Sequence, residues 1–323
     1  MKPFIHLPSQ VLAFLAVVMA CNQAIESLAA EPQAEIVWVM SLNLWHGGDG
    51  GKQPLDQMVT LIRQSQADLV GLQETAGFAP QGKPRPDRTA EIARRLGWHH
   101  VEQGGGTGIV SRFEIVAVTP KKWGIKVKLP SGRHLYHFNA HLFHSPYQPY
   151  QLLGIPYGKA PFLKTGEEAV QAARDTRGDE VARLLAEVKT ILPDGVPVFI
   201  TGDFNEPSHL DWTPASVKAG HCPLPVLWPS TQAVEAAGFI DTYRAVYPDP
   251  VKNRGLTWTP RTRVDDPKDR HDRIDFVFVG GPPFRVRAAR VVGESPEYAD
   301  VVVSPYPSDH RAVVSEVEFP AGK

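Results

Sequence analysis

Cysteine is scarce in this sequence: Cys21 and Cys222 are the two cysteines among 323 residues. Two cysteines do not support a disulfide framework or a metal site built from thiolates. An excess of charge is also missing, because 34 Lys and Arg balance 35 Asp and Glu. Dedicated nucleic-acid binders usually carry a basic excess, so this balance disfavours that class, although a local basic patch remains compatible with it.

The chain has no apolar run long enough for a membrane-spanning helix. The run at 11–20 (VLAFLAVVMA) falls short of the ~20 residues that such a helix needs. It follows Lys2 and precedes the small residues at 27–30, which predicts a signal peptide over residues 1–30 and a mature chain of 31–323 without a transmembrane span. A lipoprotein signal that acylates Cys21 is an alternative, and a buried core helix is a further one. Either signal predicts export, to the extracellular space or the periplasm.

Apolar patterns predict a large domain that mixes strands with helices. Runs rich in branched and aromatic residues predict strands at 36–42, 68–73, 107–112, 115–119, 135–140, 196–201, 273–279, 284–292 and 312–319. Spacings of three and four residues predict helices around 55–62 and 181–192. No repeat and no low-complexity linker divides the chain. We therefore expect one α/β domain, with long structured loops built from its 30 Pro and 27 Gly.

Two stretches do not fit this alternation of strands and helices, and a third is unusual in its charge. The stretches 143–166 and 209–229 are rich in proline and aromatic residues, and long irregular loops inside a domain are often functional. Three roles are open for their aromatic residues: to line a pocket wall, to bind a lipid headgroup at an interface, or to pack within the loops. These residues are Tyr147, Tyr150, Tyr157, Trp212 and Trp228. The stretch 261–273 holds five Lys/Arg and four Asp. It is either a source of phosphate contacts or a solvated loop of mixed charge.

Polar side chains follow the predicted strands at several places. The residues concerned are Asn43, Glu74, Asp203, Asn205, Asp309 and His310, with His141 and Asp275 within or beside strands. Polar groups gather in this way when several strand ends meet at one edge of a sheet. Carboxylate and amide oxygens suit Mg²⁺ or Mn²⁺ better than zinc.

Two histidines accompany these oxygen ligands. His141 and His310 are suited to contact a phosphate oxygen or to move a proton near neutral pH. Asp275 lies in an apolar strand and needs a partner. A hydrogen bond to His310 would fix the tautomer of that ring.

The order of these motifs resembles the endonuclease/exonuclease/phosphatase superfamily. The matching segments are Ser41-Leu42-Asn43, Gly71-Leu72-Gln73-Glu74, Asn139-Ala140-His141-Leu142, Gly202-Asp203-Phe204-Asn205, Arg273-Ile274-Asp275-Phe276 and Ser308-Asp309-His310. The resemblance implies a four-layer α/β sandwich, in which two packed mixed β-sheets are flanked by helices. It also implies a divalent-metal-dependent hydrolase of phosphate esters.

The resemblance further assigns roles to single residues. It makes Glu74 the main metal ligand, with Asn43 and Asp309 in the metal shell. Asp203 would orient or deprotonate the attacking water, and Asn205 would bind the phosphate. His310, held by Asp275, would stabilise developing charge or act as a base, and His141 would contact a phosphate oxygen or assist the leaving group.

One departure bears on the branch of the superfamily. Leu44-Trp45-His46 follows Asn43, where apurinic endonucleases typically place an Asp two residues after the Asn. Together with the predicted export signal, this argues against the DNA-repair branch. The leading hypothesis is a secreted phosphoesterase acting on a small molecule, a phospholipid headgroup or nucleic acid. An extracellular nuclease and a non-catalytic binding module on the same scaffold are the alternatives. The sequence leaves the oligomeric state open.

Overall fold

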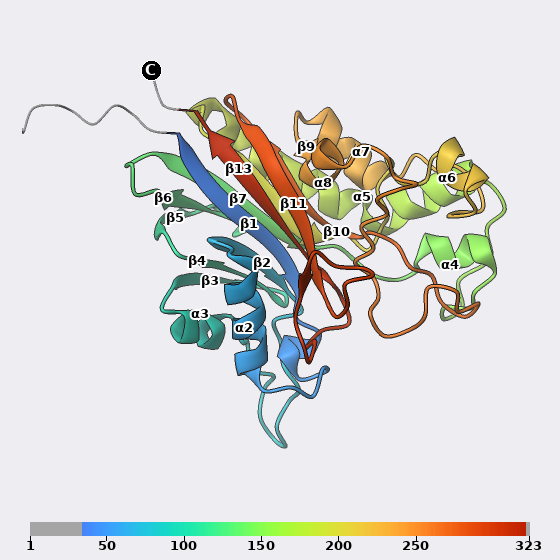
Figure 1. Cartoon of the computed structure of the whole chain (residues 1–323), viewed down its shortest axis with the longest axis horizontal. Helices are drawn as coiled ribbons and strands as arrows, with labels where there is room; N and C mark the ends of the chain where they lie inside the picture. The colour runs from blue at the N-terminus through green and yellow to red at the C-terminus, as the bar shows by residue number, and fades with distance from the viewer. Residues whose placement is uncertain (1–33, 321–323) are drawn as a thin grey trace, which may run out of the picture. The chain divides into compact units, whose positions relative to one another are not determined.

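The computed structural model describes residues 34–320, which form two mixed β-sheets (Figure 1). In spatial order, the first sheet of this part consists of β12 (Val301–Val302), β11 (Arg285–Gly293), β13 (Ala312–Phe319), β1 (Glu35–Asn43), β2 (Leu69–Gln73), β4 (Thr107–Ser111) and β3 (His99–Gly104). The second consists of β5 (Glu114–Val118), β6 (Gly124–Lys128), β7 (His134–His141), β8 (Val198–Asp203), β10 (Asp275–Gly280) and β9 (Ile240–Asp241). Both sheets are mixed, because β1–β2 and β7–β8 are parallel pairs among antiparallel neighbours.

Helices connect and cover the strands. The α-helices are α2 (Leu55–Ser65), α3 (Thr89–Leu96), α4 (Gln148–Leu153), α5 (Gly166–Ile191), α6 (Pro214–Lys218), α7 (Pro229–Ala236) and α8 (Thr242–Val246), and the 3-10 helices are η1 (His46–Gly48) and η2 (Leu192–Asp194). None of the helices in residues 34–320 has both the length and the apolar character that a membrane crossing requires.

Strand alternation produces three apolar layers. On β1, Val37 and Val39 face the second sheet, where they share a cluster with Phe199 and Val277. The intervening positions, Met40 among them, contact α2 and α3 on the outer face. In the same way the outer face of the second sheet packs against α5 and α7. Because successive side chains of a strand point to opposite faces, this arrangement is a four-layer α/β sandwich, as expected from the resemblance.

Each of the nine predicted strands overlaps a strand of the structure, and both predicted helices are present. Four strands were not predicted: β3, β6, β9 and β12. The β3 sequence, His99–Gly104, is polar and its side chains are largely exposed, so it lacks an apolar pattern. Helix α5 begins at Gly166, well before the predicted helix, where Thr165 and Glu168 form a capping box. The predicted signal peptide, including Cys21, lies outside the described residues, and the domain limits of 31–323 stay a prediction.

Candidate active site

Three predicted site residues lie side by side on neighbouring strands of the second sheet. His141 at the end of β7 is in register with Asp203 at the end of β8, and Asp203 is in register with Asp275 at the start of β10. All three occupy alternate positions that continue the inner face of their strands, as Val277 and Phe199 do further along. Strand pairing therefore places a histidine and two carboxylates in one row at the edge of the inter-sheet core.

Below this row, a polar layer joins the two sheets. Gln73 on β2 donates to the side-chain oxygen of Asn139 on β7 at 2.6 Å, and Thr201 on β8 donates to the same oxygen at 3.2 Å. Gly71 makes the close approach possible, since a Cβ there would lie 2.1 Å from Oγ1 of Thr201 and 2.4 Å from Oδ1 of Asn139. The sheets are thus tied together directly beneath the candidate site.

The first sheet contributes Asn43 and Glu74 from the ends of its parallel strands β1 and β2. The amide nitrogen of Asn43 donates to Glu74 at 3.2 Å and to Asp203 at 3.0 Å, while its oxygen accepts the main-chain N–H of Trp45 at 2.9 Å. Ser308 donates to the main-chain oxygen of Asn43 at 2.7 Å, which ties the loop before β13 to the end of β1. Asn43 therefore links carboxylates from both sheets.

Left-handed residues follow three of these strand ends. Trp45 and His46 after β1, Glu74 after β2 and Asn205 after β8 have φ values of 55°, 53°, 52° and 47°. Positive φ is uncommon for residues with a side chain, and each instance costs roughly 1–3 kcal/mol. The strained positions gather at one pocket, which all four side chains line. Such concentration of strain is typical of functional sites.

Asp275 and His310 form the buried hydrogen bond that the sequence predicted, with 2.9 Å between Nδ1 and Oδ2. The other ring nitrogen of His310 lies 3.7 Å from Oδ2 of Asp203. Burial disfavours the charged ring, but the carboxylates of Asp275 and Asp203 outweigh burial and raise the pKa of His310 to about 10. Burial also raises the pKa of Asp275. His310 is therefore held as a cation between two acids at neutral pH.

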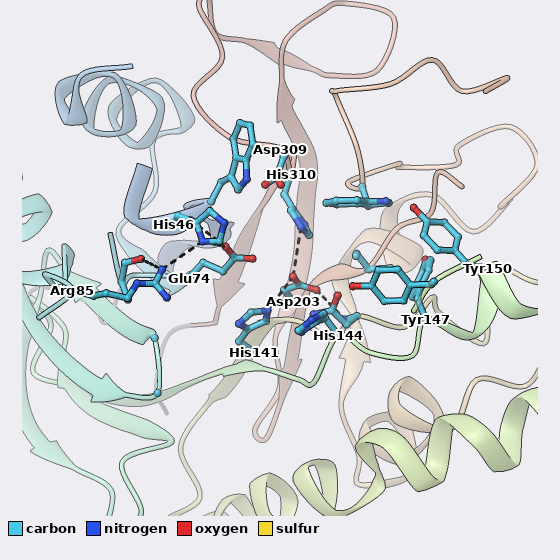
Figure 2. A pocket seen from close by; sticks show the side chains of 18 residues that line it. His46, Glu74, Arg85, His141, His144, Tyr147, Tyr150, Asp203, Asp309 and His310 are labelled. Atoms are coloured by element: carbon cyan, nitrogen blue, oxygen red, sulfur yellow. Dashed lines mark hydrogen bonds and ion pairs between the residues drawn. The ribbon is translucent and has the colours of Figure 1, made fainter. Parts of the chain in front are cut away.

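Glu74, which follows β2, and Asp309, in the loop before β13, both line this pocket (Figure 2). Burial raises the pKa of Glu74, but His141 and His310 outweigh it and leave that pKa below its ordinary value. Burial, with a contribution from the charge of Glu74, raises the pKa of Asp309 to about 6. The buried Oδ1 of Asp309 has no hydrogen-bond partner within the described part of the chain. A carboxylate that lacks a partner beside a second carboxylate fits a hard divalent cation.

A closer group of potential ligands consists of Asp203, Asp275 and His310, whose ligand atoms lie within 4.8 Å of one another. The hydrogen bond between Asp275 and His310 already occupies one atom of each. Glu74 and Asp309 are outside this close group, so the assignment of Asn43, Glu74 and Asp309 to the metal stays a prediction. The oxygen of Asn43 is engaged by Trp45, although a carbonyl oxygen has a second lone pair for a cation.

The pocket has a volume of about 610 Å³. Six of the eight predicted site residues line it: Glu74, His141, Asp203, Asn205, Asp309 and His310. Asn43 and Asp275 are buried and support these side chains through Glu74, Asp203 and His310. The Nε2 atom of His141 lies 3.6 Å from Asp203, and Asn205 donates to the main-chain oxygen of Leu142 at 3.0 Å. The structure thus brings all eight predicted residues to one place.

One wall of the pocket is aromatic. We call it the tyrosine wall; it consists of Tyr147, Tyr150, Tyr157 and Trp258. The hydroxyl of Tyr147 donates to Asp272 at 2.9 Å and that of Tyr150 donates to Asp269, so both phenols are anchored by the loop 261–273. The hydroxyl of Tyr157 makes no hydrogen bond within residues 34–320.

The structure decides between the roles that the sequence left open for the aromatic and charged loops. Trp212 and Trp228 do not line the pocket but pack together in a buried cluster beside α5, with ring centroids 5.2 Å apart. The charges of the loop 261–273 mostly neutralise one another or nearby acids: Arg270 pairs with Asp272, and Arg273 with Asp211 and Asp241. These pairings neutralise charges of the loop behind the tyrosine wall. Arg261 differs, since it has no ion pair within residues 34–320 and lies over the ring of Trp45, 5.0 Å from its centroid.

The opposite wall contains residues that the sequence did not single out. Its members are Trp45, His46 and Arg85. The main-chain N–H of His46 donates to Oε2 of Glu74 at 3.1 Å, and its ring nitrogen Nδ1 lies 3.5 Å from the same oxygen. Arg85 comes from the loop between β2 and α3. The sequence offered one signal for a role of Arg85, which is the positive charge of this loop. The sequence of the loop does not reveal that it folds back to the end of β2.

Comparison with known proteins agrees with this geometry. The model of the Endonuclease/Exonuclease/phosphatase family matches residues 40–310, and the chain belongs to this family. Members of the family are phosphoesterases and nucleases.

Three similar proteins illustrate the relationship. A Caenorhabditis elegans protein named Uncharacterized protein F14F9.5 is 29% identical over 302 residues, covering 87% of this chain and 91% of that protein. The endonuclease/exonuclease/phosphatase structure from Beutenbergia cavernae has a TM-score of 0.55 at 19% identity and covers 88% of this chain and 72% of that one. The 3' phosphatase NExo from Neisseria, solved with a product DNA hairpin, has a TM-score of 0.51 at 18% identity and covers 86% and 98%. Both structures support the fold.

Proposed function

We propose that this protein hydrolyses phosphate esters in this pocket with the help of Mg²⁺ or Mn²⁺. The observation that carries the proposal is the meeting of Glu74, Asp309 and Asp203 beside a cationic His310, with one carboxylate oxygen of Asp309 left without a partner. Acids crowded in this way favour a divalent cation, and a phosphate ester is the anion that both a cation and a charged histidine attract. Membership of the family supports the same chemistry.

Each residue has a task in the proposed reaction. Glu74 and Asp309 would hold Mg²⁺ or Mn²⁺, which would supply a Lewis acid for a phosphate oxygen. Asp203 accepts a proton from the water that attacks phosphorus, and His310 donates a hydrogen bond to the oxygen on which charge develops. The bond from phosphorus to the alcohol oxygen then breaks, and His141 provides the proton that this oxygen needs. The products are the alcohol and the phosphate with one ester bond fewer.

The test is hydrolysis of bis-p-nitrophenyl phosphate by the purified chain, with and without added Mg²⁺ or Mn²⁺ and with EDTA. We expect turnover that the cation restores after chelation. A panel of plasmid DNA, RNA, sphingomyelin, inositol phosphates and phosphomonoesters, under the same conditions, distinguishes a nuclease from a hydrolase of small esters. Binding of such esters without turnover of any of them would instead support a non-catalytic module.

We further propose that the protein is exported, on the basis of the charged, apolar and small-residue segments at 1–30. Mass spectrometry of the protein from its native host should find a mature N-terminus near Glu31 or an acylated Cys21. An intact Met1 in the soluble cytoplasmic fraction would contradict export and leave the proposed chemistry untouched.

A further inference from the structure

The two walls of the pocket differ in charge. Among the described residues that line the pocket, Arg85 is the one lysine or arginine. It stands in the wall formed with Trp45 and His46, whereas the carboxylates of Asp269 and Asp272 lie behind the tyrosine wall. A substrate with unevenly distributed charge would therefore bind in one orientation.

Arg85 is held in place without being neutralised. Its Nε donates to the main-chain oxygen of Gly77 at 2.8 Å and its Nη2 to that of Ala76 at 2.7 Å. No carboxylate of the described chain lies within 4.0 Å of the guanidinium, in contrast to Arg88 nearby, which pairs with Asp49 and Glu91. The second terminal nitrogen, Nη1, makes no hydrogen bond within residues 34–320. Two N–H groups of a fixed, fully charged guanidinium thus remain available.

The loop that carries Arg85 is attached close to the metal-competent carboxylate. A β-bridge joins Ala76 to Asp87, and the main-chain N–H of Gly77 donates to the oxygen of Pro86 at 2.8 Å. The base of the loop is thus two residues from Glu74. Nη2 of Arg85 lies 3.5 Å from Nδ1 of His46, and that nitrogen lies 3.5 Å from Oε2 of Glu74 (Figure 2). One imidazole ring therefore separates the guanidinium from the metal-competent centre.

Two glycines, Gly105 and Gly106, line the pocket without a side chain. A Cβ at either would meet nothing within 4 Å, and the main-chain oxygen of Gly106 accepts the N–H of Thr75, next to Glu74, at 2.9 Å. The ring of His46 is itself supported by Phe78, with centroids 5.2 Å apart. A guanidinium is planar and matches the oxygens of a phosphate through parallel hydrogen bonds. Nη1 of Arg85, which makes no hydrogen bond within residues 34–320, can bind such a group at the pocket surface.

We propose that Arg85, with His46, forms a second anion subsite, so that preferred ligands carry another phosphate group beyond the scissile one. The inference rests on the proposed function, because it places the scissile phosphate at Glu74. The second phosphate lies on the Arg85 side, and the uncharged part of the ligand lies against the tyrosine wall. The subsite recognises charge and takes no part in bond breaking.

Isothermal titration with a matched pair of ligands tests this subsite. Adenosine 5'-phosphate carries one phosphate, and adenosine 3',5'-bisphosphate adds a second to the same scaffold. A hydrogen bond to a charged group contributes about 1.5–3 kcal/mol, so the wild type should bind the bisphosphate at least ~10-fold more tightly. Arg85→Gln should remove most of that preference, whereas Lys83→Gln, which loses an exposed cation outside the pocket, should keep it.

The outcomes separate this inference from the proposed function. Equal affinities of the wild type for the two ligands would overturn the subsite, and so would an equal loss of preference in Lys83→Gln, which would indicate long-range charge alone. Hydrolysis of bis-p-nitrophenyl phosphate by the same preparation reports on the proposed function. A hydrolase without a preference for the bisphosphate refutes only the subsite, and a preference without hydrolysis refutes only the catalytic proposal.

Discussion

The floor of the pocket and its two walls differ in how their side chains are held. The floor consists of Glu74, which is partly exposed, and of Asn43, Asp203, Asp275 and His310, which are almost fully buried, and hydrogen bonds connect them in two groups. On the walls, residues such as His46 are partly exposed and come from loops. Strand register places the floor, and loop conformation places the walls. The difference fits the proposal that the floor performs the chemistry, which needs fixed geometry, and that the walls select the substrate.

The largest expected effect concerns a charge on the floor. Glu74→Gln keeps the size of the side chain and removes the charge that would hold a cation. We predict a loss of turnover of at least ~10²-fold, comparable to the removal of one group that stabilises a transition state. Hydrolysis of bis-p-nitrophenyl phosphate at saturating Mg²⁺ measures it, with circular dichroism to verify folding. Glu91→Gln, on α3 and bonded to Arg88 and Arg95, is the matched control. Near-full turnover of Glu74→Gln would remove Glu74 from the metal site.

The next effect concerns the buried pair of the floor. His310→Ala and Asp275→Asn should each lower kcat by roughly 10²-fold, within the range of general acid–base groups. The double variant should lose less than the product of the two single losses, because the side chains act as one unit. Steady-state kinetics of the wild type, the two single variants and the double variant completes this double-mutant cycle. A loss in the double variant equal to the product of the two single losses would show that the residues work independently.

The same pair predicts a pH dependence. The carboxylates raise the pKa of His310 to about 10 despite its burial, so the cation is present at lower pH and is lost as the pH rises through that value. If the cation is required, turnover should decline on the alkaline side. Asp275→Asn removes one of these charges and should move the alkaline limb to lower pH. The measurement is turnover as a function of pH for the wild type and Asp275→Asn. An alkaline limb at the same pH in both proteins would contradict a role for Asp275 in keeping His310 protonated.

A smaller effect is expected from the layer beneath the floor. Gly71→Ala would place a Cβ 2.1 Å from Oγ1 of Thr201, and overpacking of this kind costs roughly 1–3 kcal/mol of unfolding free energy. Gly178→Ala in α5 is the contrasting control, because the nearest atom to its Cβ is 3.9 Å away. Replacing a helical glycine by alanine should stabilise the protein by about 1 kcal/mol or less. Opposite shifts in thermal denaturation are therefore predicted, and similar shifts would show that the sheets can move apart at Gly71.

The smallest effects distinguish two members of the tyrosine wall. Tyr147→Phe removes a hydrogen bond to Asp272 and should lower the unfolding free energy by about 1 kcal/mol. Tyr157→Phe removes a hydroxyl that has no partner in the described chain, so its stability should change by less than ~0.5 kcal/mol. The KM of Tyr157→Phe should instead rise by roughly threefold, since Tyr157 lines the pocket and its hydroxyl is free to bind the substrate. Denaturation curves and steady-state kinetics of both variants test these roles. A stability loss in Tyr157→Phe together with a raised KM only in Tyr147→Phe would contradict them.

The contrast between floor and walls also explains how far the sequence could predict this molecule. Asn43, Asp203 and Asp275 lie on strands with clear apolar patterns, so their meeting at one edge follows from strand alternation and from the family's order of motifs. Trp212 and Trp228 have the same composition signal as Tyr147, yet they are buried in another cluster. Arg85 could not be predicted to line the site, because the path of its loop depends on hydrogen bonds to Ala76 and Gly77.

Direct binding tests, independently of any substrate, whether the floor holds a divalent cation through Glu74. Isothermal titration of the chelator-treated protein with Mn²⁺, near neutral pH, should detect saturable binding in the wild type and in Glu91→Gln. Glu74→Gln should bind at least ~10-fold more weakly, the equivalent of about 1.4 kcal/mol. The absence of Mn²⁺ binding in the wild type, or equal binding in Glu74→Gln, would contradict the account.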